Sequence, residues 1–199
     1  MYNDGKRQWL IAGLGNPGRK YANTRHNVGF KAIEQMAQVW HIAIDTRKFK
    51  VRFGRGHYNG AQIILAQPMA YMNCSGPPVC QLAAYFNIPV EQTLIVHDDI
   101  EIEKGRLKIK AKGGHGGHNG LKSISEAFGG GNFPRIRLGI GRPAAPMEVT
   151  DYVLGRFSPA EWRDFEPTID RAEKAVATIL EKGVTAAMNQ FNMANEPDK

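Results

Sequence analysis

The sequence predicts one α/β domain whose twisted central sheet is mixed, mostly parallel, and flanked by helices. Short apolar stretches typical of buried strands alternate with stretches of helical periodicity, which is the pattern of a layered α/β fold. Two strand-like stretches meet at Asn59-Gly60, a hairpin signal that predicts a mixed sheet rather than a wholly parallel one. At 199 residues with 42% hydrophobic content, the chain has the size of a single domain (1–199), with loose ends expected at about 1–7 and 195–199.

The individual elements follow from apolar patterns and from the residues that bound them. The first half predicts a strand at 9–13, a helix capped by Asn23 or Thr24 that runs to about Trp40, hairpin strands at 50–58 and 62–66, and a helix at 77–86. The second half predicts a strand at 93–97 that ends in Asp98-Asp99, strands at 105–110 and 135–140 with alternating basic and apolar residues, and a helix at 121–128.

The last part of the chain is predicted to be helical. Ser158-Pro159-Ala160-Glu161 is a capping box that opens a helix to about Lys182, and Gly183 separates it from a shorter helix to about 192. The glycines and prolines between 139 and 146 are typical of a mobile segment before the capping box. Whether the segment 143–157 acts as a lid is left open by the sequence.

Positive charge gathers in one region of the chain. The whole sequence has 26 Lys+Arg against 19 Asp+Glu, a formal net charge of +7. The segment 104–142 contains nine of these basic residues and one acid, Glu126. The rest of the chain is therefore close to neutral. Clustering of this kind favours a polyanionic partner, most often nucleic acid, over a solvated basic face.

The same region contains an unusual glycine-rich loop. Five glycines lie among the eight residues 113–120, together with His115, His118 and Asn119. Glycine lets a backbone adopt positive φ and come close to a ligand, and the histidines and the asparagine offer donors and acceptors. The loop is a candidate binding site within the basic region.

A second glycine pattern has a different interpretation. The stretch from Gly13 to Gly18 literally satisfies G-x-G-x-x-G after a strand. In a dinucleotide site a helix begins within the glycines, whereas here Pro17-Gly18 predicts a turn and the helical pattern starts about eight residues later. The sequence therefore argues against a nicotinamide enzyme, and no cofactor is expected.

Five polar residues fall at strand ends or in loops that lead into helices, where ligands bind in open α/β sheets. These are Asn16, His26, Asn73, Asp98 and Asn119. His26 is a candidate general base, and Asp98 could fix its tautomer. The three amides can hold a peptide backbone or a polarised carbonyl without adding charge. Because no G-x-S-x-G nucleophile pattern occurs, water is the expected attacking group.

Metal-based and disulfide-based alternatives are weaker. His115 and His118 with Asp98-Asp99 could ligate zinc in principle, but a glycine-rich loop does not hold ligands rigidly; no metal is therefore expected. Two cysteines, Cys74 and Cys80, are too few for a disulfide framework and fit a reducing compartment. No apolar run approaches the length of a membrane helix, so a cytoplasmic protein is expected.

These residues, taken in order, resemble the bacterial peptidyl-tRNA hydrolase family. The matching motifs are Gly13-Leu-Gly-Asn-Pro-Gly18, Tyr21 with Thr24-Arg-His-Asn27, Tyr71-Met-Asn-Cys-Ser-Gly76, His97-Asp-Asp99, Gly113-Gly-His-Gly-Gly-His-Asn-Gly-Leu121 and Arg137-Leu-Gly-Ile-Gly-Arg142. The resemblance extends from Trp9 to about Asn192. Several motifs in register are far more specific than any one of them.

The resemblance implies an enzyme that cleaves the ester between a peptide and the 3′ ribose of tRNA, which recycles tRNA in translation. It implies His26 as catalytic base, Asp98 as orienting acid, and Asn16 and Asn119 as amides that place the water, the substrate or the developing oxyanion. The substrate-binding residues that it implies are Tyr21, Tyr71, Met72, Asn73, His118 and Asn119, with Lys110 and Arg137 as a clamp for the 5′ phosphate.

The resemblance further implies a monomer that acts without a covalent intermediate and needs no obligate protein partner. A runner-up function is that of the plant organellar relatives, which act in RNA splicing without hydrolysis. The intact residues Asn16, His26, Asp98 and Asn119 favour the enzyme, because a binding-only relative has no need of them.

Overall fold

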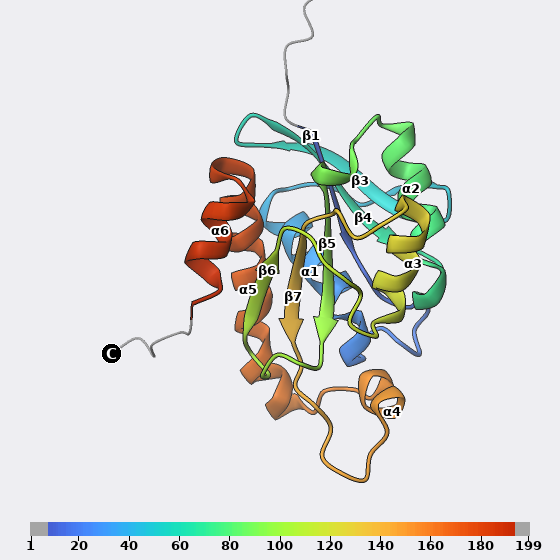
Figure 1. The fold of residues 1–199 in the computed structure, drawn as a ribbon, viewed down its shortest axis with the longest axis vertical. Helices are drawn as coiled ribbons and strands as arrows, with labels where there is room; N and C mark the ends of the chain where they lie inside the picture. Colours follow the sequence, from blue (N-terminus) through green and yellow to red (C-terminus); the bar gives the residue numbers. More distant parts are fainter. Residues whose placement is uncertain (1–7, 194–199) are drawn as a thin grey trace, which may run out of the picture.

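The computed structural model describes residues 8–193 as one seven-stranded sheet between two layers of helices (Figure 1). The strand order is β2-β3-β4-β1-β5-β7-β6. The strands are β1 (Gln8–Gly13), β2 (Thr46–Lys48), β3 (Val51–Tyr58), β4 (Ala61–Pro68), β5 (Thr93–Asp99), β6 (Leu107–Lys110) and β7 (Arg135–Gly139). The expected loose ends lie at residues outside the described range.

The centre of the sheet is parallel and its edges are antiparallel. Strands β4, β1, β5 and β7 run parallel to one another. On one side β3 pairs antiparallel with β4 and β2 with β3, and on the other side β6 pairs antiparallel with β7. The hairpin turn is where it was predicted, with positive φ at both Asn59 (46°) and Gly60 (78°), as a type I′ turn requires. The predicted mixed α/β sheet is confirmed.

Helices cover both faces of the sheet. α1 (Val28–Val39), α5 (Pro159–Lys182) and α6 (Val184–Phe191) pack on one face, and α2 (Gly76–Tyr85) and α3 (Asn119–Phe128) pack on the other. The short α4 (Val149–Leu154) lies apart, beyond the carboxyl ends of the parallel strands (Figure 1). None of the helices in the described range is long and apolar enough to cross a membrane.

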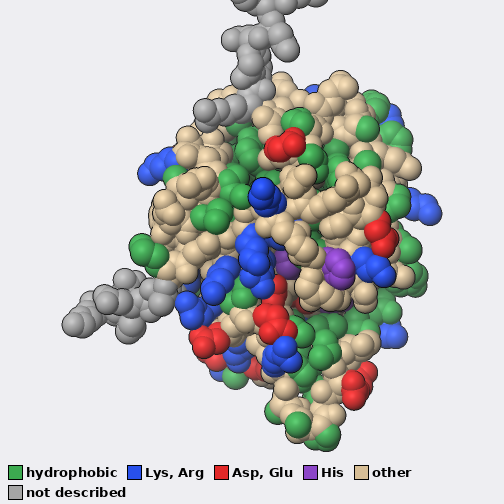
Figure 2. All heavy atoms as spheres, in the orientation of Figure 1, with side chains coloured by type: hydrophobic (Ala, Val, Ile, Leu, Met, Phe, Trp, Pro, Cys, Tyr) green, Lys and Arg blue, Asp and Glu red, His purple; other side chains and the backbone are tan. Residues whose placement is uncertain are grey.

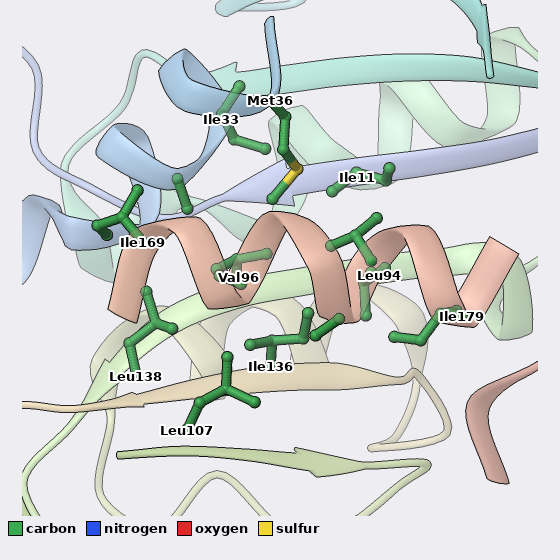
Figure 3. Packing of buried hydrophobic residues seen from close by; sticks show 14 of the residues in the cluster. Ile11, Ile33, Met36, Leu94, Val96, Leu107, Ile136, Leu138, Ile169 and Ile179 are labelled. Carbon is green, nitrogen blue, oxygen red and sulfur yellow. The ribbon is translucent and has the colours of Figure 1, made fainter. Parts of the chain in front are cut away.

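The core explains why β1 and β5 read as continuous apolar runs. Side chains alternate between faces along a strand, so Trp9 and Ile11 enter the cluster under α1 and α5, while Leu10 and Ala12 enter the cluster under α2 and α3. Figure 3 shows the first cluster, in which residues of α5 and α1 pack over the apolar side chains of β1, β5 and β7. A strand buried on both faces cannot show a polar alternation.

Several boundaries differ from the predictions, and two short elements were not predicted. The first long helix begins at Val28 rather than after Thr24, because the 3₁₀ helix η1 (Arg25–Asn27) precedes it and the Asn27 side chain bonds the backbone of Asn16 instead of capping a helix. Strand β5 continues through Asp99, and α3 begins at Asn119. The short strand β2 and the short helix α4 were not predicted, because segments of three to six residues carry too little periodicity to be recognised.

Candidate active site

A cavity of about 530 Å³ opens where the parallel strands end. All five polar residues selected from the sequence line it, although they come from five separate segments. Its wall also includes Tyr71, Met72 and His118, while residues of α4 form an apolar side: Val149, Val153 and Leu154. Of the implied substrate residues, Tyr21, Lys110 and Arg137 do not line this cavity.

His26 and Asp98 form the centre of the cavity wall. The Nδ1 atom of His26, on η1, lies 2.8 and 2.9 Å from the two carboxylate oxygens of Asp98 at the end of β5. Burial alone would lower the pKa of His26, but the charge of Asp98 and its hydrogen bond outweigh burial, and the pKa is raised above 6.5. Burial alone would raise the pKa of Asp98, but the two neighbouring histidines hold it well below its usual range. An ionised carboxylate only accepts hydrogen bonds, so Nδ1 donates and Nε2 keeps its lone pair.

His118 gives Asp98 a second donor. The residue is the N-cap of α3, where its Nδ1 accepts the backbone N–H groups of Gly120 (3.1 Å) and Leu121 (3.2 Å). Because Nδ1 accepts, Nε2 is the nitrogen that bears the hydrogen, and it donates to Oδ1 of Asp98 at 3.0 Å. One buried carboxylate thus fixes two imidazoles, whose ring centres lie 5.1 Å apart.

A third histidine, His97, stands behind this network and was not selected from the sequence. It is fully buried on β5, its Nδ1 lies 2.6 Å from the carbonyl oxygen of Asp98, and its ring packs edge-on against His118 at 4.8 Å. Burial, and then repulsion from His118, lowers the pKa of His97 to about 3. His97 is therefore neutral at physiological pH and supports His118 by packing rather than by charge.

The asparagine side chains of the cavity differ in whether they hydrogen-bond to the protein. Asn16 is held by two hydrogen bonds between its backbone and the side chain of Asn27, both 2.9 Å, and its Oδ1 accepts the N–H of Met72 at 2.8 Å. Its Nδ2 donor has no partner among residues 8–193. The exposed side chains of Asn73 and Asn119 likewise make no hydrogen bond within this range. These amides are available to bind polar groups of a ligand.

The glycine-rich loop is fixed by a buried arginine. Positive φ angles occur at Gly113 (147°), Gly116 (55°) and Gly117 (80°), which accounts for the choice of glycine there. Arg135 is 1% exposed, and its guanidinium donates to the carbonyls of Gly114 and Gly131 at 3.0 Å. Hydrogen bonds from a charged group contribute about 1.5–3 kcal/mol each. The base of the loop is therefore anchored, although a glycine-rich loop was not expected to be held rigidly.

Helix α4 is attached to the segment that carries His26. The backbone N–H of Arg25 donates to Gly155 (3.0 Å), and its guanidinium donates to Arg156 O (3.1 Å) and pairs with Glu161 (2.8 Å). The OH of Tyr152 donates to Ile140 at 2.6 Å. The segment 143–157, which the sequence left open as a possible lid, thus contains a helix that these contacts attach beside the cavity.

Next to the cavity, β6 and β7 present basic side chains on one face of the sheet. Lys108 pairs with Arg137 and Lys110 with Arg135 in the antiparallel register, and residues two apart on a strand share a face. Arg135 is buried, and we call the other three, Lys108, Lys110 and Arg137, the basic strand face. Figure 2 shows a group of Lys and Arg side chains beside the histidines, over β6 and β7.

The geometry also bears on the metal alternative. Among residues 8–193, the potential ligand atoms of His26, Asp98 and His118 lie within 4.8 Å of one another. The ring nitrogens of these histidines that face Asp98 already hydrogen-bond to it. His115 does not belong to the group: it is exposed, and its Nδ1 accepts the N–H of Gly117. The arrangement suits a histidine base oriented by a carboxylate.

Known proteins share both the sequence and the fold. Residues 10–199 match the family model described as peptidyl-tRNA hydrolase. The chain is 46% identical to the peptidyl-tRNA hydrolase of Bacillus cytotoxicus over 183 residues, which is 92% of this chain and 98% of that protein. It is 43% identical to that of Bacillus subtilis, with 92% and 97% covered. The crystal structure of peptidyl-tRNA hydrolase from Acinetobacter baumannii is similar with a TM-score of 0.88 at 41% identity, over 94% of this chain and 95% of that one.

Proposed function

The chain belongs to the peptidyl-tRNA hydrolase family and hydrolyses the ester bond of peptidyl-tRNA, and from this premise we propose how its residues perform the reaction. His26 acts as the general base on water. The observation that carries this assignment is the pairing of its Nδ1 with Asp98, which leaves the Nε2 lone pair available in a residue that lines the cavity. A splicing function without hydrolysis is not favoured.

The reaction begins with a water molecule placed by the amides of Asn16 and Asn119. His26 Nε2 takes a proton from this water while its oxygen bonds to the ester carbonyl carbon, and the carbonyl becomes an oxyanion. The side-chain amides of Asn119 and Asn73 donate N–H groups to this oxyanion. These neutral donors stabilise the negative charge as it develops in the transition state. The C–O bond to the ribose then breaks, and the 3′ oxygen leaves with the proton from the His26 imidazolium. No peptidyl-enzyme forms.

Asp98 orients the imidazole and stabilises its charged form during the step. The carboxylate is 2% exposed, so its attraction for the imidazolium is little screened by water. His118 shares the carboxylate and keeps it in place through Oδ1.

The remaining residues bind substrate. Tyr71, with 62% of its surface exposed, and Met72 contact the acceptor end and the peptidyl part. Tyr21 contacts the acceptor end from the loop before η1. Lys110 and Arg137 bind the 5′ phosphate of the tRNA. The enzyme works as a monomer in the cytoplasm, where its tRNA substrate is found.

A turnover assay on an N-acetyl-aminoacyl-tRNA tests the proposal. Wild-type protein should release free tRNA, whereas His26→Asn should retain tRNA binding and lose turnover. Acid-quenched reaction mixtures analysed by mass spectrometry should contain no acylated enzyme. Retained turnover in His26→Asn, or an acyl adduct on the protein, would refute the mechanism.

A further inference from the structure

The two neighbouring acids at the end of β5 serve different parts of the molecule. Because side chains alternate along a strand, Asp98 meets His26 and His118, whereas Asp99 lies on the other face and meets Arg137. An acid beside an anion site is unexpected, since its charge repels the ligand. The contacts of Asp99 give a reason for its presence.

Both carboxylate oxygens of Asp99 are occupied. Oδ1 accepts the backbone N–H of Glu101 at 2.9 Å, which fixes the carboxylate to the turn after β5. Oδ2 accepts the Nε–H of Arg137 at 2.7 Å, and the two side chains are only 14% and 18% exposed. Within residues 8–193 the terminal nitrogens Nη1 and Nη2 of Arg137 have no hydrogen-bond partner. The carboxylate therefore holds the guanidinium of Arg137 through Nε and leaves Nη1 and Nη2 available to bind a ligand.

The surroundings of Arg137 make such a support necessary. Lys108 lies directly across from it on β6, Lys110 lies diagonally, and buried Arg135 is two residues away on the same strand. The pKa of Arg135 is lowered to about 10, first by burial and then by repulsion from Arg137. Without a counter-charge, an arginine among three cations would be pushed away from them. Asp99 is the acid that pairs with it.

We propose that Asp99 is a positioning residue of the anion site: it holds Arg137 so that Nη1 and Nη2 together face the 5′ phosphate of tRNA. An arginine binds a phosphate best through two parallel N–H groups, and an orientation fixed before binding reduces the entropy that binding costs. The inference rests on the proposed role of Arg137 as a phosphate ligand.

The variant Asp99→Asn tests the proposal by the sign of its effect. An asparagine oxygen can still accept the N–H of Glu101, but its amide cannot accept from Arg137 at the same time. If Asp99 positions Arg137, KM on full-length peptidyl-tRNA should rise about 3- to 10-fold with kcat unchanged. If Asp99 acted only as a nearby negative charge, its removal would lower KM, because phosphate would be repelled less.

A double-mutant cycle and a matched control complete the experiment. In an Arg137→Ala background, Asp99→Asn should no longer raise KM, because Asp99 supports phosphate binding only through Arg137. Glu101→Gln removes a carboxylate of the same turn that pairs with Arg142, both exposed, and should leave KM within about twofold. A peptidyl-nucleotide without a 5′ phosphate should show the same KM with wild type and Asp99→Asn.

Five outcomes would overturn the inference. A lower KM in Asp99→Asn would mean that Asp99 only repels the phosphate. An unchanged KM would mean that Asp99 has no role in tRNA binding. Additive effects in the cycle show that it does not act through Arg137. An equal loss on the short substrate means that Asp99, which lines the cavity, contacts the ribose or the peptide. If Arg137→Ala itself leaves KM unchanged, the phosphate clamp fails as well, which distinguishes that failure from a failure of Asp99 alone.

Discussion

At the centre of the cavity, His26, Asp98 and His118 are largely buried and pair with one another, whereas on the basic strand face the two lysines have no partner within the described residues and only Arg137 is paired, with Asp99. Asp98 is 2% exposed and receives two histidine donors. Lys110, by contrast, is exposed and makes no hydrogen bond or ion pair within the described residues. The first arrangement fixes the geometry of a reaction before substrate arrives, and the second leaves charge available to a partner in solution.

The difference predicts which kinetic constant each region controls. Groups that act mainly in the transition state change kcat, while groups that bind substrate and transition state equally change KM. Buried pairs also respond little to salt, whereas exposed cations are screened within about 10 Å at 0.1 M salt. Four experiments test this division.

The largest effect is expected for His26→Ala. Loss of general-base assistance should lower kcat about 10²- to 10⁴-fold with little change in KM, measured by steady-state release of tRNA. His57→Ala, which removes an exposed histidine from β3, is the control and should retain full activity. Equal kcat values for wild type and His26→Ala would mean that another group activates the water.

The second experiment uses Asp98→Asn and the pH profile. Because the pKa of His26 is raised above 6.5, wild-type kcat/KM should fall as pH drops through that raised value and the base becomes protonated. Without the carboxylate charge, burial alone acts on His26 and lowers its pKa, so the acid limb of the variant should move to lower pH. At pH 8, kcat should fall about 10- to 100-fold, because the tautomer and the imidazolium lose their support. An acid limb that stays in place would show that Asp98 does not set the basicity of His26.

The division between the regions was only partly visible in the sequence. The strand ends gave the five polar residues of the cavity, because polar residues that follow buried strands meet at one edge of a parallel sheet. The pairing of Asp98 with both His26 and His118 depends on how segments 20 and 72 residues apart pack. Sequence periodicity does not contain that information.

Arg135 shows where the pattern misled. By alternation it belongs with Lys110 and Arg137, and the sequence counted it among the charges that attract nucleic acid. In the fold, the carbonyls of Gly114 and Gly131 cover it, so it stabilises the glycine loop instead. His97 was not selected as a site residue for a related reason. Nothing in the sequence around it indicates that its ring packs against His118. Alternation predicts which residues share a face, and only tertiary contacts decide which of them are covered.

The third experiment moves to the basic strand face. Arg137→Ala should raise KM on full-length peptidyl-tRNA about tenfold and leave kcat nearly unchanged, because a charged ligand of the phosphate is lost without a change at His26. The same variant should show wild-type constants on a peptidyl-nucleotide that has no 5′ phosphate. A fall in kcat on both substrates would place Arg137 within the chemical site and contradict the division.

The smallest expected effect is that of Lys110→Ala on salt dependence. A lysine that contacts a phosphate releases about one counterion from the RNA when it binds, so each contact adds about 0.7–0.9 to the slope of log affinity against log salt concentration. Removal of Lys110 should flatten the slope by about that amount and weaken binding a few-fold near 0.1 M salt, with binding measured by fluorescence titration of labelled tRNA. Lys174→Ala removes a lysine that is also exposed, from α5 on the other face of the sheet. This variant should leave the slope unchanged, because salt screens a charge that lies away from the bound tRNA. The comparison between these two variants separates the effect of a direct phosphate contact from the effect of the protein's net charge. Equal flattening in both would mean that the protein attracts tRNA through its total charge and that the basic strand face has no specific contact to lose.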